Sequence, residues 1–344
     1  MDMSLHFLGT AGSVPSARRG LPALLLVRGG ERLLFDCGEG TQRQMLRSIG
    51  LVELDSVFIT HFHADHWLGL PGMLKSFALR ERTQPLTVYG PSGLIEMMEA
   101  MRVVYGRRLP YELHLVELEP WEEVERDGYQ IASVPVKHGG RAAVGYVLLE
   151  HQRPGEFDPR EAERLGVTPG PAFGLLQRGQ TVGGVRPEQV MGSPREGRKI
   201  VISGDTAPCE TLAVAAHGAD VLVHEATFAE EERERARETA HSTARQAAEL
   251  ARDAEVKLLA LTHVSGRYVG GEIREQARAV FAATEAPRDF DAIEVPFPER
   301  GGATLVRWSG RRARERGAEP EAGADQDTGA DREANTAPEP IVMP

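Results

Sequence analysis

The densest group of potential metal ligands in this sequence is HFHADH, at residues 61–66. Imidazole nitrogens and carboxylate oxygens both bind divalent cations such as Zn²⁺. In an extended segment His61, His63 and Asp65 share one face, and a turn after Ala64 brings His66 to the same cavity. One tetrahedral zinc takes about four donors in total. Four donors within six residues, with further partners elsewhere, therefore fit two metal ions better than one.

Further potential ligands follow apolar runs elsewhere in the chain. SVFIT is followed by His61, KIVISG by Asp205, DVLV by His224 and Glu225, and LLALT by His263. The carboxyl ends of strands in α/β sheets are where ligand sites are assembled. We therefore expect these four endings to converge on one site.

The chemistry of such a site suits phosphodiester hydrolysis. Two ions about 3.5 to 4 Å apart polarise a phosphoryl oxygen and activate water at neutral pH. His241 lies just before a predicted helix, whose start is marked by Thr243 and Gln246 at capping-box spacing. A helix N-terminus favours a phosphate, and a histidine there titrates near neutrality.

The elements that must position these residues alternate between short β-rich apolar runs and helical stretches, which favours an α/β fold. The predicted strands are 23–27, 32–35, 56–60, 86–89, 143–149, 199–203, 220–223 and 258–262. The predicted helices are 41–48, 69–79, 92–105, 243–253 and 271–284. Residues 151–197 carry many prolines and glycines with little periodicity, so we interpret them as an inserted arm.

Length and composition are typical of a globular protein with a large apolar core. With 344 residues, 41% hydrophobic and 26% charged, the chain is long enough to bury a large core. No apolar run reaches the roughly 18 residues that a bilayer span needs, and the N-terminus lacks the order of a signal peptide, so we expect a cytoplasmic protein with no membrane association. Two cysteines, Cys37 and Cys209, build no disulfide framework, and we expect both to be reduced and buried.

The net charge of −11 argues against a nucleic-acid binder that relies on bulk positive charge. Part of this charge is local, since residues 317–344 hold seven acids against the single base Arg332. We expect residues 311–344 to form a disordered acidic tail, because they have few large apolar residues with which to offset the entropy of ordering. The folded body is predicted to span residues 1–310.

The HxHxDH pattern of residues 61–66 resembles the signature of the metallo-β-lactamase superfamily. That resemblance implies a four-layer αβ/βα sandwich with a dinuclear zinc site. The segments FLGTAGSVPSARRG, FDCGEGTQRQ, GLPG, HEATF, AHST and LTHVSGRY together resemble the ribonuclease Z family of tRNA 3′-processing endonucleases, over about residues 4–308. One departure is Ala64, where the family usually has glycine.

The resemblance implies a ligand set and a cofactor. His61, His63 and His138 would hold the first zinc, Asp65, His66 and His263 the second, and Asp205 would bridge them. Two Zn²⁺ per subunit are expected, and Mn²⁺ is a chemically reasonable substitute.

The resemblance also implies catalytic roles. His241 would be the general acid that protonates the leaving oxygen, oriented by Glu225, and Asp65 would help to deprotonate the attacking water. Asp36 follows an apolar run, and we expect it to orient a ligand histidine by accepting its second N–H. His224 is expected to have a supporting or core role. We expect structural roles for the histidines outside the motifs, which are His6, His114, His151 and His217.

The same resemblance implies a function for the arm. TPGPAFG, with Gly170 and Pro171, resembles the tip of the flexible exosite arm with which this family grips the tRNA elbow. A second contact of this kind multiplies the affinity of the catalytic site. Arg102, Arg107 and Arg108 are candidates for the path between arm and metals, although a solvated face explains them equally well. The resemblance implies a homodimer in addition.

These observations predict a zinc-dependent endoribonuclease that removes the 3′ trailer from precursor tRNA. The cut would leave a 3′-hydroxyl on the tRNA and a 5′-phosphate on the trailer. One alternative keeps the metals but acts on a small thioester, lactone or sulfate ester. Another is an RNA-binding or scaffolding protein with a vestigial metal fold, which the full set of seven ligands disfavours.

Overall fold

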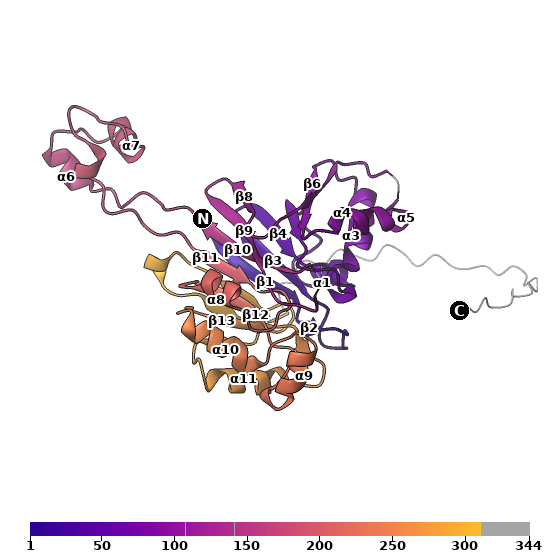
Figure 1. The fold of residues 1–344 in the computed structure, drawn as a ribbon. Coiled ribbons are helices and arrows are strands. Elements are labelled where there is room, and N and C mark those ends of the chain that lie inside the picture. Colours follow the sequence, from indigo (N-terminus) through magenta and orange to yellow (C-terminus); the bar gives the residue numbers. More distant parts are fainter. Residues whose placement is uncertain (107, 141, 311–344) are drawn as a thin grey trace, which may run out of the picture. The chain divides into compact units, whose positions relative to one another are not determined.

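Two β-sheets lie face to face between two layers of helices in the computed structural model of the chain (Figure 1). The structure describes residues 1–106, 108–140 and 142–310, and Met1–Ser309 form one compact unit. The predicted acidic tail, residues 311–344, lies outside the described residues. The division into a body and a tail stays a prediction.

The first sheet has eight strands. Their order is β17 (Thr304–Val306), β16 (Ala292–Glu294), β1 (Met3–Gly9), β3 (Ala23–Arg28), β4 (Glu31–Phe35), β5 (Ser56–Phe58), β6 (Leu86–Gly90) and β7 (Leu113–Glu117). Strands β4 to β7 run parallel to one another, and the other pairs are antiparallel. The carboxyl end of β5 therefore points to the same edge as the ends of its two neighbours.

The second sheet has seven strands. Their order is β15 (Thr284–Glu285), β13 (Leu259–Thr262), β12 (Val221–Glu225), β11 (Lys199–Ile202), β10 (Val144–Glu150), β9 (Tyr129–Pro135) and β8 (Glu123–Arg126). Strands β11, β12, β13 and β15 are parallel, so their carboxyl ends share one edge. A short third pair joins β2 (Ala11–Gly12) to β14 (Val264–Ser265).

Three apolar cores hold the layers together. The inner core joins the two sheets, and its aromatic centre packs Phe58 against Phe35 at 5.0 Å and against Tyr146 at 5.3 Å between ring centroids. One outer core packs α1 (Thr41–Ser48), α3 (Gly69–Leu79), α4 (Leu94–Ala100) and α5 (Arg102–Tyr105) on the first sheet. The other packs α8 (Glu210–Ala216), α10 (Ala244–Asp253) and α11 (Gly270–Arg278) on the second sheet. The predicted four-layer αβ/βα sandwich is confirmed.

The predicted elements match the observed ones with two corrections. The helix predicted over 92–105 is divided into α4 and α5 at Met101. The helix predicted over 271–284 ends at Arg278, because Thr284 begins β15 beside Leu259. Apolar residues continue the helical pattern past the true end, but the Arg278 guanidinium donates to the Thr284 carbonyl at 2.8 Å and closes the turn there. Strands β1, β2, β7, β8, β9 and β14 to β17 are additions to the predicted set, and so are the helices α8 and α9 (Arg233–Glu238).

The arm has more regular structure than its sequence pattern predicts. It contains α6 (Pro159–Arg164) and α7 (Pro171–Gln177), which share a small core that includes Ala162, Leu176 and Val190. Two backbone bridges, Arg153 with Arg195 and Phe157 with Met191, pair the segments that lead to it. The helices are short and each starts at a proline, so they lack the long periodicity that marks a helix in sequence.

Two other findings concern the cysteines and the lengths of the helices. Cys37 and Cys209 are free and buried, as predicted. No helix in the described part of the chain has the length and apolar character needed to span a bilayer.

Candidate metal centre and active site

The HFHADH segment turns before Asp65, so His61 and His63 have the predicted extended spacing but Asp65 lies on a helix and joins His66 instead. After β5 the chain stays extended through His63, and α2 (Ala64–Trp67) begins at the next residue. The His66 amide donates to the His63 carbonyl at 2.9 Å and so closes the turn. The change from extended to helical backbone places the four potential ligands of the motif in two neighbouring groups of donor atoms.

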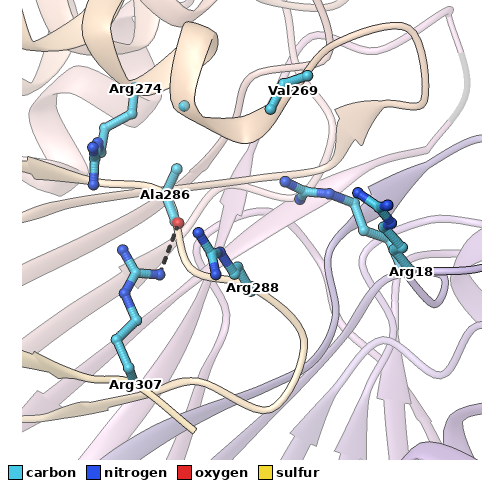
Figure 2. A pocket seen from close by; sticks show the side chains of 8 residues that line it. Arg18, Val269, Arg274, Ala286, Arg288 and Arg307 are labelled. Carbon is cyan, nitrogen blue, oxygen red and sulfur yellow. Dashed lines mark hydrogen bonds between the residues drawn. The ribbon is translucent and has the colours of Figure 1, made fainter.

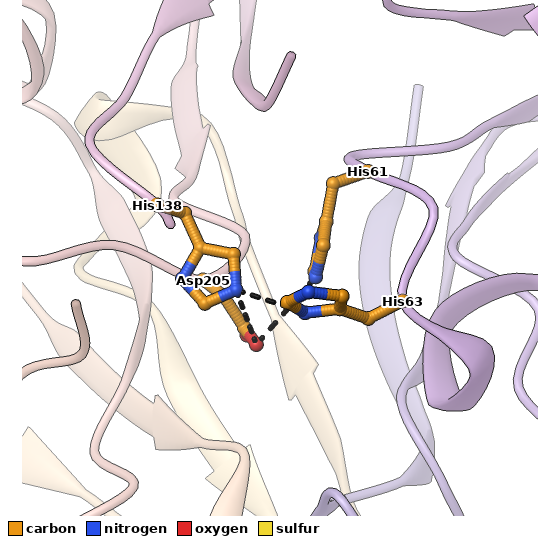
Figure 3. A group of neighbouring side chains, drawn as sticks. All are labelled: His61, His63, His138 and Asp205. Atoms are coloured by element: carbon orange, nitrogen blue, oxygen red, sulfur yellow. Dashed lines mark hydrogen bonds and ion pairs between the residues drawn. The ribbon is translucent and has the colours of Figure 1, made fainter. Parts of the chain in front are cut away.

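Four of the predicted ligands form the first group, shown in Figure 3: His61, His63, His138 and Asp205. Their donor atoms all lie within 4.8 Å of one another. His63 Nδ1 and His138 Nε2 are 3.0 Å apart, and Asp205 Oδ2 lies 3.8 Å from His61 Nε2. The chain contributes these residues from positions that follow β5, β9 and β11.

The second group consists of Asp65, His66 and His263. The Nε2 atoms of the two histidines are 3.3 Å apart, and Asp65 Oδ2 lies 3.6 Å from that of His66 and 3.3 Å from that of His263. Asp205 Oδ2 is also 3.3 Å from both of these nitrogens. One oxygen of Asp205 thus faces both groups, which is the placement expected of a bridging carboxylate.

The chemistry of these donors fits a pair of divalent cations. Two ligands about 2.0 to 2.1 Å from one tetrahedral zinc lie roughly 3.3 Å apart, close to the spacing in the second group. His61 Nε2 is buried and has no hydrogen-bond partner among the described residues. Since a buried polar nitrogen is costly without a partner, a bound cation is a reasonable partner for it.

The charges of the site favour cation binding. Burial opposes ionisation of Asp205, but His263 and His66 beside it hold the pKa of that carboxyl well below its usual range. The pKa of Asp65 is likewise lowered, against burial, by its hydrogen bond with His263. Burial, followed by the neighbouring His66, lowers the pKa of His61 well below its ordinary value. Two carboxylates and at least one neutral imidazole are therefore available as donors near pH 7.

Asp36 orients one of the ligand candidates, as predicted. Its Oδ2 lies 2.7 Å from His66 Nδ1, so the opposite nitrogen, Nε2, faces the second group. Asp36 is itself fixed by the Thr60 amide and hydroxyl at 2.8 and 2.9 Å. Its backbone has φ of +58°, an uncommon conformation for a residue other than glycine.

Other orienting groups are absent from the sequence-based prediction. Thr227 Oγ1 lies 2.8 Å from His263 Nδ1, and the Ala240 carbonyl lies 3.0 Å from His138 Nδ1. Thr227 belongs to the HEATF segment and lies shortly after a strand, and this position could have predicted its contact with His263. The Ala240 contact uses only the backbone carbonyl, so the type of the residue gives no sign of it in the sequence.

His241 and Glu225 form a close pair beside the metal-ligand candidates. Glu225 is fully buried at the end of β12, and its Oε1 lies 2.8 Å from His241 Nδ1. Burial opposes the charged imidazole, but Glu225 and then Asp205 raise the pKa of His241 to about 9. His241 precedes α10, where Thr243 and Gln246 form the predicted capping box.

Geometry alone also brings His241 within ligand distance. A third group joins Asp205, His241 and His263, with donor atoms within 4.8 Å of one another. His241 Nδ1, however, is held by Glu225 at 2.8 Å and lies 3.8 Å from Asp205 Oδ2. The Glu225 contact favours an acid–base role over a ligand role for that nitrogen.

The remaining candidates lie apart from this cluster. His224 is buried, and its Nδ1 lies 2.7 Å from the Glu225 carbonyl. The described ligand groups contain none of the other predicted structural histidines, which are His6, His114, His151 and His217. Gly170 and Pro171 begin α7 in the arm and are exposed. Arg102 is exposed beside Glu99, Arg108 is exposed, and Arg107 lies outside the described residues.

Comparison with known proteins identifies the family. The model of the beta-lactamase superfamily domain matches residues 31–264. A protein of Methanosarcina acetivorans named ribonuclease Z is 44% identical over 302 residues, which is 86% of this chain and 99% of that one. The chain belongs to the ribonuclease Z family. A ribonuclease Z of Myxococcus xanthus is 46% identical over 305 residues, covering 86% of this chain and 98% of its own length.

Solved structures agree with this family assignment. The short form of human tRNase Z matches with a TM-score of 0.63 and 26% identity, over 86% of this chain and all of the human chain (100%). The metallo-beta-lactamase fold protein YhfI of Bacillus subtilis matches with a TM-score of 0.64 and 18% identity, over 85% of this chain and 99% of that one. The second likeness shows the fold alone.

The Asp36 contact generates the first prediction. Asp36→Ala removes the group that fixes the ring of His66, and we expect the affinity for divalent metal to fall about 10- to 100-fold. Competition with a chromogenic chelator measures the affinity. Asp55→Ala, an exposed aspartate that binds the Arg32 amide, is the matched control and is expected to change nothing. Equal affinity in both variants would contradict the orienting role.

Proposed function

We propose that this chain is a zinc-dependent endoribonuclease that cleaves the 3′ trailer from precursor tRNA, leaving a 3′-hydroxyl on the tRNA and a 5′-phosphate on the trailer. The observation that carries the proposal is the single oxygen of Asp205 that faces two groups of metal-ligand candidates. The names of the relatives, ribonuclease Z and tRNase Z, supply the class of substrate.

The proposed ligands are the residues that the structure brings together. His61, His63 and His138 would hold one Zn²⁺, Asp65, His66 and His263 the other, and Asp205 would belong to both. A pair of such ions supplies Lewis acidity toward a phosphoryl oxygen and activates water at neutral pH. Mn²⁺ would be tolerated where oxygen donors are present. Asp65 would also help to deprotonate the attacking water, because its carboxylate is charged and can accept a proton, although its lowered pKa makes it a weak base.

His241 is proposed to protonate the leaving 3′-oxygen. The buried carboxylate of Glu225 holds the ring through Nδ1 and stabilises its charged form. Glu225 is fixed in turn by the Thr206 amide at 2.8 Å and by the Thr227 hydroxyl at 2.5 Å. A charged imidazole held in this way can release a proton as negative charge develops on the leaving oxygen.

The arm is proposed to bind the tRNA away from the cut, through the turn at Gly170 and Pro171. Its two helices have a core of their own, which would keep that turn in shape at the end of the arm. We also propose, from the family resemblance, that the enzyme acts as a homodimer in the cytoplasm.

The central test uses purified protein and a precursor tRNA with a 3′ trailer. The wild type is expected to hold two zinc ions per chain and to cut at the 3′ side of the acceptor stem. Asp65→Ala removes one donor and is expected to lower cleavage at least about 1000-fold, with tRNA binding within a few-fold of wild type. Zinc is counted by mass spectrometry, and the cut is mapped to the nucleotide on substrates with and without CCA. Cleavage that survives complete removal of zinc would refute the mechanism.

The His241–Glu225 pair generates a prediction on pH. The proposed acid works only when protonated, so kcat falls as pH rises through the pKa of His241, about 9. Glu225→Gln removes the charge that raises this pKa, and the basic limb of the kcat profile should move at least about one unit toward lower pH. His241→Ala should abolish that limb. A basic limb that stays in place in Glu225→Gln would show that another group donates the proton.

Removing the arm tests its role in RNA binding. Phe157 and Met191 pair through their backbones, so a short Gly-Ser linker between these two paired positions can replace residues 158–190. We expect kcat/KM for precursor tRNA to fall about 100-fold, because the shortened protein would hold the tRNA at the catalytic site alone. Hydrolysis of bis-p-nitrophenyl phosphate should change less than about twofold, since that substrate is too small to reach the arm. Equal decreases on both substrates would assign the arm a structural role.

A further inference from the structure

A cavity of about 350 Å³ beside the start of α11 is lined by five arginines (Figure 2). They are Arg18, Arg19, Arg274, Arg288 and Arg307, and the other lining residues are Val269, Gly271 and Ala286. None of the eight lining residues is acidic. This concentration of positive charge stands out in a chain with a net charge of −11.

The five arginines come from separate parts of the chain. Arg18 and Arg19 lie between β2 and β3, and Arg274 lies on α11. Arg288 precedes β16, and Arg307 follows β17 at the edge of the first sheet. The fold therefore brings like charges together, which costs free energy unless an anion offsets it.

Nearby carboxylates neutralise only part of this charge. Arg307 pairs with Asp291 at 2.6 Å, and Arg274 pairs with Glu275 at 3.3 Å. Glu285 lies 3.6 Å from Arg307 and 3.8 Å from Arg274, so one carboxylate is shared between two guanidinium groups. Asp289 acts on Arg19 as well, so carboxylates face three of the five arginines, and the positive charges of Arg18 and Arg288 remain.

Other observations show that guanidinium groups around the cavity are available to an anion. The guanidinium groups of Arg18 and Arg288 make no hydrogen bond or ion pair with any residue that the structure describes. Arg274 Nε is buried and has no hydrogen-bond partner within the described residues. Burial lowers the pKa of Arg19, Asp289 opposes that shift, and the nearby Arg288 adds to it. A phosphate group offers several acceptor oxygens and negative charge, and a guanidinium binds it through two parallel N–H groups.

The cavity adjoins the proposed metal centre through shared segments. The loop that carries Arg18 also carries Ser13, whose amide donates to Asp65 Oδ2 at 2.8 Å. On the other side, β14 directly follows His263 and pairs with β2, and α11 begins five residues after β14. The same two chain segments therefore contribute both to the proposed metal centre and to the lining of the cavity.

We propose that this arginine cavity binds a backbone phosphate of the RNA substrate and so positions the strand at the metal centre. The inference rests on the proposed function for the identity of the strand. The nine-residue helix α11 adds free amides at its N-terminus, beside Gly271, which favour the same anion.

The test uses Arg18→Ala combined with Arg288→Ala in the full chain. Both side chains are exposed, so the fold should tolerate their removal, and thermal unfolding checks this. Arg252→Ala removes an exposed arginine at the far end of α10 and is the matched control. The measurements are KM for precursor tRNA at several salt concentrations and the Kd for a single-stranded RNA dodecamer by fluorescence anisotropy.

We expect the double variant to raise the KM for precursor tRNA and the dodecamer Kd about tenfold or more, while the control matches the wild type. The slope of log affinity against log salt should become shallower by about 0.7 for each phosphate that the double variant no longer binds. The decrease of kcat/KM on the precursor should exceed that on bis-p-nitrophenyl phosphate by about tenfold, since the diester does not extend to the cavity.

Other outcomes separate this inference from the proposed function. If RNA affinity and salt slope stay at wild-type values, the cavity does not bind RNA, even where the enzyme cleaves precursor tRNA. If inorganic phosphate binds the wild type but not the double variant, and RNA binding is unaltered, a free anion is the ligand and the inference is overturned. In a further outcome, the wild type fails to cleave precursor tRNA while the double variant still binds RNA more weakly than the wild type. That result would support RNA binding by the cavity and would refute the proposed function.

Discussion

The structure depends on one buried carboxylate, Asp205, and on what surrounds it. Its Oδ2 lies 3.3 Å from the Nε2 atoms of His66 and His263, and imidazole nitrogens of three other histidines lie within 3.9 Å of it. A buried charge is costly unless it is paired, so this carboxylate requires positive partners at a fixed position. Protonated imidazoles meet that need only partly, since burial favours the neutral form of His61. Bound divalent cations would meet it fully and would link the stability of the site to metal binding.

The layered fold allows Asp205 to face five histidines. Parallel strands end at a common edge, and β11, β12 and β13 deliver Asp205, Glu225 and His263 to the same edge of the second sheet. The first sheet delivers the HFHADH segment at the end of β5. His263 has φ of +54°, as Asp36 has +58°, so the backbone adopts uncommon conformations where side chains must turn toward the cavity. The apolar cores hold these positions in place.

Sequence patterns predict the parts of the site that are local or that end strands. The HxHxDH spacing, the ligand-type residues that follow apolar runs, and the capping box at Thr243 all have counterparts in the structure. Contacts between segments that are far apart in the sequence cannot be predicted in this way, because no local sequence pattern encodes them. The carbonyl of Ala240 near His138 is one example, and the arginine cavity, built from segments as distant as Arg18 and Arg307, is another. The two arm helices are not predicted, because each is too short to show the helical periodicity of apolar residues.

Net charge alone is a poor guide to how this chain handles a polyanion. A value of −11 argues against binding through bulk positive charge, yet long-range charge is screened within about 8 to 10 Å at physiological salt. An RNA phosphate in contact with the protein responds to the charged side chains nearest to it. Five arginines around one cavity are a strong local source of positive charge. The acids of residues 317–344 account for much of the imbalance, so the rest of the chain is less negative than the whole. A negative chain with a few placed cations binds a phosphate where the cations are and repels it elsewhere, which favours one alignment of the strand over sliding along the surface.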